Sequence, residues 1–129
     1  MYGLTAVVEL ARRHDQGPVQ IRDIADAHGI PQHYLEQILV ALKKSGIVES
    51  VRGAQGGYSL ARPPGAIPVE EVLAILDGKL EVVAEGWREG ALSFYWKQVE
   101  EGLRRAITGN VQELLLRVQH AEGQLHYSI

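Results

Sequence analysis

The polar residues between positions 31 and 44 have the order expected of a helix that reads nucleic acid. Imidazole, carboxylate and amide side chains come first, on His33, Glu36 and Gln37, and two cations, Lys43 and Lys44, come last. A recognition helix reaches base edges mainly with its N-terminal residues, whereas phosphate contacts position a protein without reading sequence. The order therefore predicts base contacts at the start of this helix and phosphate contacts at its end.

A glycine-rich run, RGAQGG, follows at residues 52–57. Its glycines tolerate positive φ and let another backbone come close. A phosphate cradle for a nucleotide would need a helix immediately after the glycines, but the residues that follow, YSLAR, are typical of a strand. A β-hairpin wing with Arg52 at its shoulder fits better, and a solvated hairpin turn without any ligand is the simpler alternative.

An apolar stripe must hold the polar helix in place. Its residues recur at the i, i+3, i+4, i+7 spacing of a buried helix side, and they are Leu35, Ile38, Leu39 and Leu42. Either Pro31 or Gln32 lies in the first turn of this helix, where the missing amide of a proline costs nothing, and Gly46 ends it. A short helix precedes it from Ile21, with Gly29 as its left-handed C-terminal residue, and a first helix is expected over residues 3–14. Helix, turn, helix and hairpin is the order of a winged helix-turn-helix.

Three further helices are predicted after the connector at residues 63–66. The first has Pro68 in its first turn and ends at Gly78; its stripe is Val69, Val72, Leu73 and Leu76. Residues 79–90 are expected to be a loop. A helix from Ala91 then shows the 4, 3, 4, 3 spacing of a coiled-coil seam, formed by Leu92, Trp96, Val99, Leu103 and Ala106. We expect this seam to pack on a twofold mate; an ordinary core helix in a monomer is the alternative.

The last helix begins after Asn110, which together with Glu113 resembles a capping box. Its apolar stripe consists of Val111, Leu114, Leu115 and Val118.

Composition excludes several classes of protein. The 129 residues suit one domain, and the absence of cysteine excludes disulfides, thiolate zinc sites and cysteine-ligated iron–sulfur clusters. The net charge of −3 is uneven, with +1 over residues 1–62 and −4 over residues 63–129. The first half can therefore offer a local basic face. No apolar run suits a membrane span or a signal peptide, so we expect a cytoplasmic protein.

The residues do not predict catalysis, a metal or a cofactor. No paired carboxylates, nucleophile–base arrangement or cofactor loop stands in a credible setting, so we expect no enzyme. The five histidines are scattered, and even His120 and His126 lie six apart, off a common helical face.

Three longer runs carry a family resemblance. They are YGLTAVVELA near the start, HYLEQIL in the third helix, and SVRGAQGGYSLARPPGAI followed by VEEVLAILDG. These runs resemble the Rrf2 family of bacterial winged-helix transcription regulators. The resemblance is close over residues 2–78, and beyond them the family also has a long helix like the one expected from Ala91. The resemblance implies a homodimer on double-stranded DNA, with third helices in successive major grooves and wings over flanking minor grooves. Half-sites would lie one helical turn apart, about 34 Å, or a multiple of it.

The resemblance also assigns residues. It places five positions of the third helix where family members touch bases and phosphates: Pro31, His33, Tyr34, Glu36 and Gln37. It places Arg52 in the minor groove, where a narrowed A·T tract is most negative. In chemical terms, Glu36 can accept from a cytosine amino group and Gln37 can pair with adenine. The backbone amides of Gly56 and Gly57 can approach a phosphate.

Some of these residues have simpler alternatives. Tyr34 can instead be half-buried packing, and Glu36 can pair with a lysine of its own chain. We expect His33 to be a phosphate or surface contact rather than a pH sensor.

The best-known family members bind an iron–sulfur cluster through three cysteines in the region that corresponds to residues 79–91, and this chain has none. It is similar instead to the cluster-free branch that represses cysteine and sulfur-assimilation genes with cysteine synthase as co-repressor. That enzyme accepts the C-terminal isoleucine of partner proteins, so the resemblance implies a partner-binding tail at Tyr127 and Ile129. A frayed terminus of accidental composition is the alternative.

The expected fold is mainly α with a small β-hairpin wing. Residues 1–78 would form the winged helix-turn-helix DNA-binding domain, and residues 79–129 a loop, the dimerisation helix and the C-terminal helix with its tail. The expected function is a dimeric, sequence-specific repressor. A protein-interaction adaptor with this fold and weak or no specific DNA binding is the alternative, favoured by the acidic second half.

Overall fold

The computed structural model describes residues 1–77 and 87–127. Its helices are α1 (Tyr2–Arg12), α2 (Ile21–His28), α3 (Gln32–Lys44), α4 (Val69–Asp77), α5 (Ser93–Ala106) and α6 (Val111–Tyr127). Its strands are β1 (Val48–Val51) and β2 (Gly57–Leu60), and its 3-10 segments are η1 (His14–Gln16), η2 (Pro64–Ala66) and η3 (Trp87–Glu89). The expected fold class, mainly α with one hairpin, is confirmed.

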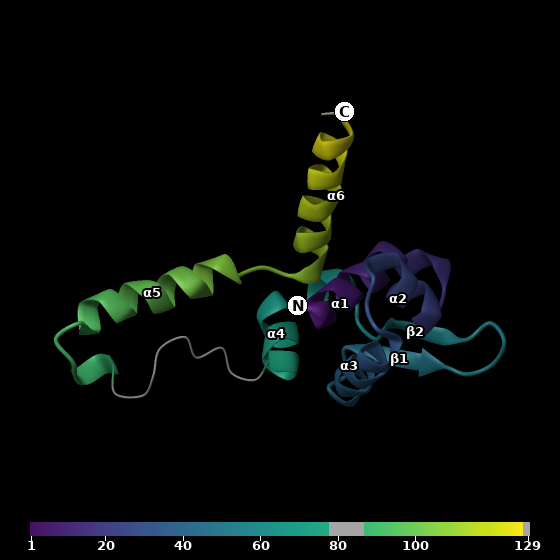
Figure 1. The fold of residues 1–129 in the computed structure, drawn as a ribbon, viewed down its shortest axis with the longest axis horizontal. Helices are drawn as coiled ribbons and strands as arrows, with labels where there is room; N and C mark the ends of the chain where they lie inside the picture. The colour runs from purple at the N-terminus through teal and green to yellow at the C-terminus, as the bar shows by residue number, and fades with distance from the viewer. Residues whose placement is uncertain (78–86, 128–129) are drawn as a thin grey trace.

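Helix α1 lies at the centre of the core. It contacts α2, α3, α4, α6 and β2, and Figure 1 shows these elements gathered around it. Its own contribution to the core is mainly Val7 and Leu10, which are buried because the apolar side of α1 faces inward. The core therefore depends on packing between helices rather than on the small sheet.

The predicted stripe of α3 faces this core. Leu35, Leu39 and Leu42 are fully buried, and Ile38 packs against them in a partly buried position. With three leucines fixed on one side, the opposite side of α3 must face outward, because a helix turns about 100° per residue.

The turn between α2 and α3 is set by Gly29. This residue has φ of 62°, in the left-handed region, as predicted for the residue that ends α2. The amide of Ile30 then donates to the carbonyl of Ala25 at 3.0 Å, and Ile30 itself is buried. The buried Ile30 and the hydrogen bond together fix the direction of α3 relative to α2.

A backbone bridge to the segment before α2 is one of the links that join the hairpin to the body. Strands β1 and β2 pair antiparallel, with Val48 opposite Leu60. Val19 and Tyr58 exchange both backbone hydrogen bonds, each 2.8 Å long. Gly57 is needed beside this bridge, because its φ is 148° and a Cβ there would collide with the Val19 carbonyl. The wing is therefore held against the helix-turn-helix.

Helix α6 returns to the core. Val111 and Leu115 are buried in the same cluster as α1 to α4. The predicted cap is present, since the Glu113 amide donates to Asn110 Oδ1 at 2.9 Å. The Glu113 carboxylate in turn accepts from Asn110 Nδ2 at 2.9 Å, rather than from the backbone as in a standard capping box. Residues of the second half thus complete the core of the first.

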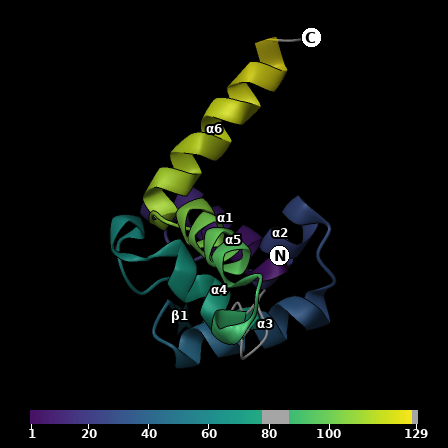
Figure 2. The same cartoon turned by 90° about the vertical axis from the view of Figure 1, so that its left-hand side faces the viewer.

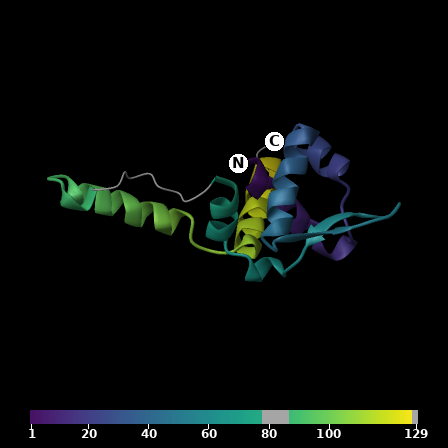
Figure 3. The same cartoon turned by 90° about the horizontal axis from the view of Figure 1, so that it is seen from below.

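Helix α5 projects away from the body. Figures 1 and 3 show it extending to the side opposite the hairpin, and its main contact is with η3. It has no buried residue. The alternative prediction of an ordinary core helix in a monomer is therefore wrong, because within one chain the apolar residues of α5 have no core to enter.

Several predicted boundaries differ from the structure by a few residues. Helix α1 ends at Arg12 and η1 follows, so the helix does not continue to His14. Helix α3 starts at Gln32, with Pro31 as the residue before it. Helix α5 starts at Ser93, which leaves the seam residue Leu92 as its N-cap. The predicted loop lies largely outside the described residues.

Candidate nucleic-acid interface

The outward side of α3 presents the polar residues that the sequence predicted. Those assigned to DNA on the start of α3 are all exposed, and they are Pro31, His33, Tyr34, Glu36 and Gln37. Figure 2 shows α3 along the lower edge of the body. The buried leucines therefore aim these side chains at solvent and leave them accessible to a ligand as large as a duplex.

Tyr34 is not core packing. Its exposed fraction is 52%, and its ring stacks at 4.4 Å from the ring of His33, tilted by 34°. About half of Tyr34 is therefore covered, in part by the ring of His33, and its role as a DNA contact stays a prediction. The contact places the two rings side by side at the first turn of α3.

Glu36 and Gln37 have free polar ends. Within the described part of the chain, Glu36 makes no ion pair with a lysine, and Gln37 makes no side-chain hydrogen bond. The alternative pairing of Glu36 within its own chain is therefore not observed. An exposed carboxylate and amide one residue apart can hydrogen-bond to neighbouring base edges.

The two lysines at the end of α3 differ. Lys43 Nζ donates to Ser50 Oγ at 2.6 Å and so links the end of α3 to β1. Lys44 is exposed. The ammonium of Lys43 retains further donors after this bond, so the link orients the group without removing its ability to contact a phosphate.

The wing presents Arg52 at its shoulder. Arg52 follows β1 directly and is exposed. Gly56 is buried in the turn, and its amide donates to the Gly53 carbonyl at 3.0 Å. This bond occupies the Gly56 amide that we expected at a phosphate, so Gly56 shapes the turn of the wing instead, and the phosphate contact of Gly57 stays a prediction. A strand follows the glycines, and the nucleotide-cradle alternative is wrong.

An ion pair that the sequence did not indicate fixes the base of the wing. Arg62 donates to both carboxylate oxygens of Glu71 on α4, at 2.6 and 3.1 Å. It also donates to the carbonyls of Gly46 and Ala66. The Arg62 pKa is raised, first through the hydrogen bond to Glu71. One side chain thus joins the end of α3, η2 and α4.

A buried carboxylate was also missed. Glu9 on α1 is 5% exposed, accepts from Arg13 Nε at 2.7 Å and lies 2.8 Å from His28 Nε2. Burial alone would raise the pKa of Glu9, but the hydrogen bonds of His28 and Arg13 outweigh it and lower the pKa. The contact joins α1 to the end of α2, so it helps to place the helix-turn-helix.

Arg12 extends this network to α6. Its guanidinium pairs with both carboxylate oxygens of Glu122, at 2.6 and 3.1 Å, and its Nε lies 3.6 Å from Glu9. The hydrogen bond from Arg12 lowers the pKa of Glu122. The projecting half of α6 is thereby tied to α1.

The predicted seam lies open on α5. Leu92 is 54% exposed, Ala106 is exposed, and Trp96, Val99 and Leu103 are partly exposed. Phe94 and Tyr95 on the same helix are exposed as well. This apolar surface faces solvent in the single chain.

The tail is described only in part. The backbone of Tyr127 ends α6, whereas Ile129 lies outside the described residues.

No described helix is long and apolar enough to cross a bilayer.

Comparison with known families gives one match over most of the chain. The model of the Rrf2 family, described as "Iron-dependent Transcriptional regulator", matches residues 1–121. The residues of this chain do not fit a cysteine-ligated iron centre. The chain has no cysteine, and its described part holds no group of three His, Cys, Asp or Glu residues that could bind a metal.

Individual relatives agree with this match. The chain is 32% identical to the HTH-type transcriptional regulator CymR of Bacillus subtilis, over 97% of this chain and 91% of that protein. Among solved structures it is similar to T. potens IscR, with a TM-score of 0.78 and 34% identity over 93% of this chain and 85% of the other. It is also similar to "CymR (YrzC) the Global Cysteine Regulator of B. subtilis", with a TM-score of 0.76 and 32% identity over 90% of this chain and 92% of the other. The chain belongs to the Rrf2 family of winged-helix transcription regulators.

Proposed function

We propose that this protein is a sequence-specific, dimeric DNA-binding repressor that acts on bacterial promoters in the cytoplasm. The observation that carries the proposal is the outer side of α3. Three fully buried leucines hold the helix, and the side chains of Glu36 and Gln37 stand exposed and unpaired within the described residues. Transcription regulators of the same family are its relatives, and their names describe no enzyme.

The proposed dimer forms through α5. An exposed apolar seam on a projecting helix loses contact with water when it packs on the same helix of a second copy. The seam of two heptads is short, so we expect the exposed Tyr95, which lies beside the seam on the helix, to widen the contact. Pairing would carry two copies of α3 onto one duplex.

The proposed role of the wing is to contact the flanking minor groove. Arg52 follows β1 at the shoulder of the turn and is exposed, and arginine favours the negative potential of a narrow A·T tract. Replacing Arg52 with alanine should weaken binding chiefly to operators with an A·T-rich flank. Equal weakening on operators with G·C-rich flanks would argue against minor-groove contact.

The test of DNA reading begins with selection of bound genomic fragments, followed by titration of the selected duplex and a scrambled one at several salt concentrations. The proposal predicts a preference for the selected duplex of at least about a thousandfold. It also predicts a log–log salt slope of several units, because lysines and arginines displace counterions. Equal and weak binding of both duplexes would contradict it.

A protein-interaction adaptor is the second candidate. The net charge of −4 over residues 63–129 favours it, because an acidic surface repels a phosphate backbone. An adaptor would show no preference between the two duplexes, yet would still dimerise.

The finer proposal is control of cysteine and sulfur genes, with cysteine synthase as co-repressor bound to the tail. It is supported by the relative described as a global cysteine regulator. The proposed contact is the isoleucine side chain of Ile129, because a C-terminal isoleucine with a free carboxylate resembles an amino-acid substrate. Capture of purified cysteine synthase should be lost when Ile129 is deleted and kept when Gln124, upstream on α6, is replaced with alanine. Undiminished capture by the shortened chain would exclude this role.

A further inference from the structure

A cavity of about 470 Å³ lies along one side of α5, away from the proposed DNA interface. Its volume falls in the range of small-molecule sites. The residues that line it are Arg88, Ser93, Phe94, Lys97, Glu100, Glu101 and Arg104. Its place on α5 makes it a second candidate binding site.

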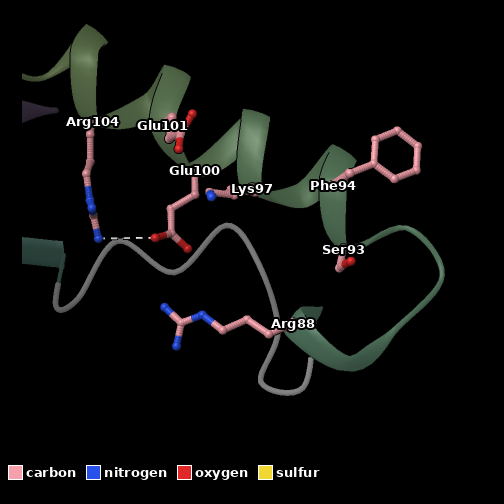
Figure 4. A pocket seen from close by; sticks show the side chains of 7 residues that line it. All are labelled: Arg88, Ser93, Phe94, Lys97, Glu100, Glu101 and Arg104. Carbon is pink, nitrogen blue, oxygen red and sulfur yellow. Dashed lines mark hydrogen bonds and ion pairs between the residues drawn. The ribbon is translucent and has the colours of Figure 1, made fainter.

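The lining is built from one helix side and one 3-10 turn. The α5 residues Ser93, Lys97, Glu100 and Arg104 follow the spacing i, i+4, i+7, i+11, which places them on a common side of a helix. Figure 4 shows that Arg88, from η3, extends its guanidinium into the space below Glu100. Two separate elements therefore line an open, solvent-accessible site.

Both signs of charge are present in the cavity. Arg88, Lys97 and Arg104 supply three cations, and Glu100 and Glu101 supply two carboxylates. Arg104 Nη2 donates to Glu100 Oε1 at 3.1 Å, while the Arg104 side chain remains 71% exposed. Phe94 stands at the rim with its ring turned away from the charges (Figure 4). The interior of the site is therefore polar and of mixed charge.

Mixed charge restricts the class of ligand. A simple anion would approach two carboxylates, and a simple cation would approach three cations, so each would meet repulsion. A small molecule with a carboxylate and an ammonium group can pair with both kinds of side chain through charge-assisted hydrogen bonds. We propose that this cavity binds a free amino acid or a similarly small zwitterion.

The position of the cavity gives such a ligand a route to DNA binding. The seam residues Leu92, Trp96 and Leu103 each precede a lining residue by one position, which corresponds to a rotation of about 100° around the helix. Ligand and proposed mate would thus occupy adjacent sides of α5. This consequence rests on the proposed function, and it makes the cavity an effector site that biases how two copies pair.

Binding of the ligand itself can be tested without DNA. The full chain would be titrated with each of the proteinogenic L-amino acids, up to about 10 mM, a range that covers weak effector affinities. Trp96 precedes the lining residue Lys97 in the sequence, so intrinsic fluorescence is a suitable reporter for every ligand except tryptophan and tyrosine, which themselves fluoresce and would be titrated by calorimetry. We expect saturable binding of at least one amino acid. No saturable binding of any of them, by a chain that is folded, would overturn the proposal.

Two variants locate the site. Lys97→Glu should weaken binding at least about tenfold, because a charge-assisted hydrogen bond becomes a repulsion. Arg105→Glu makes the same charge change on the other side of α5, outside the cavity, and should leave affinity within about twofold. Equal losses in both variants would place the ligand elsewhere.

Two analogues test the class of ligand. Propionate or propylamine that binds as tightly as the amino acid would show a site for plain ions and overturn the zwitterion assignment.

These results are separate from the test of the proposed function. Loss of sequence-specific DNA binding would leave the fluorescence titration unchanged. Conversely, a chain that reads DNA and binds no amino acid would retain the proposed function and lose only this inference.

Discussion

The helical body and α5 contrast in how their apolar residues are used. In the body, α1, α3 and the start of α6 bury their stripes in one shared cluster. In α5, a stripe of comparable regularity has no fully buried residue. We propose from this difference that one chain is sufficient to fold the helical body, whereas α5 needs a second chain to cover its seam. The proposal implies that mutations can separate DNA binding from pairing.

The largest expected effect is a loss of stability of the helical body. Leu39→Ala should lower the free energy of unfolding by about 2–5 kcal/mol, because it removes a fully buried side chain and leaves a cavity. The measurement is urea unfolding followed by circular dichroism. Val40→Ala, the adjacent exposed position, is the control and should cost less than about 0.5 kcal/mol. Equal effects would mean that α3 does not hold its stripe inward.

A charge on the seam should act on pairing instead. Leu103→Glu should weaken the dimer by about 2 kcal/mol or more, since it places a carboxylate in an apolar contact. Sedimentation would then show monomers that are still folded. Gln98→Glu adds the same charge at an exposed position off the seam and should leave the dimer intact. A fully dimeric Leu103→Glu chain would refute pairing through α5.

A third prediction concerns the buried carboxylate that joins α1 to α2. Glu9→Gln should lower stability at neutral pH by about 1–3 kcal/mol, because hydrogen bonds to a buried charged group are weakened. The folded-state pKa of Glu9 is lowered from 4.5, so its stabilising contribution is present above that value. It is lost as pH falls through the folded pKa.

Unfolding curves at several pH values would check this behaviour. The stability difference between the wild type and Glu9→Gln should shrink below about pH 4.5. Glu49→Gln, an exposed position on β1, should show no such dependence. A difference that stays constant into acid would mean that Glu9 acts through shape rather than charge.

The smallest expected effect is at the link to α6. Glu122→Gln removes the ion pair with Arg12, in which the Glu122 side chain is half exposed. Because salt screens exposed ion pairs, the variant and the wild type should become equally stable at high salt. A salt-independent loss of stability would indicate a packing role for Glu122.

Sequence patterns predicted what depends on neighbours along the chain. The stripe of α3, the left-handed Gly29 and the strand after the glycines follow from local periodicity and backbone preference, and the structure confirms them. The coiled-coil spacing likewise separated the seam of α5 from an ordinary core stripe. Its pairing with a mate stays a prediction.

Contacts between distant segments were not predictable in this way. Glu9 meets His28 because α1 and α2 pack together, and Arg12 meets Glu122 across 110 positions. No spacing rule connects such residues, since their distance depends on tertiary packing. The use of the Gly56 amide inside its own turn was missed for a related reason. The motif indicated a turn, but not which donor the turn would occupy.

The central claim is that exposed residues of α3 read bases while buried ones hold the helix. The most direct test is to measure the affinities of the wild type and Gln37→Ala for the selected operator and for duplexes changed at one base pair at a time. The claim predicts that the variant loses about 1–3 kcal/mol of discrimination at one base pair in each half-site and keeps it elsewhere. An equal loss of affinity across all duplexes, with discrimination unchanged, would contradict it.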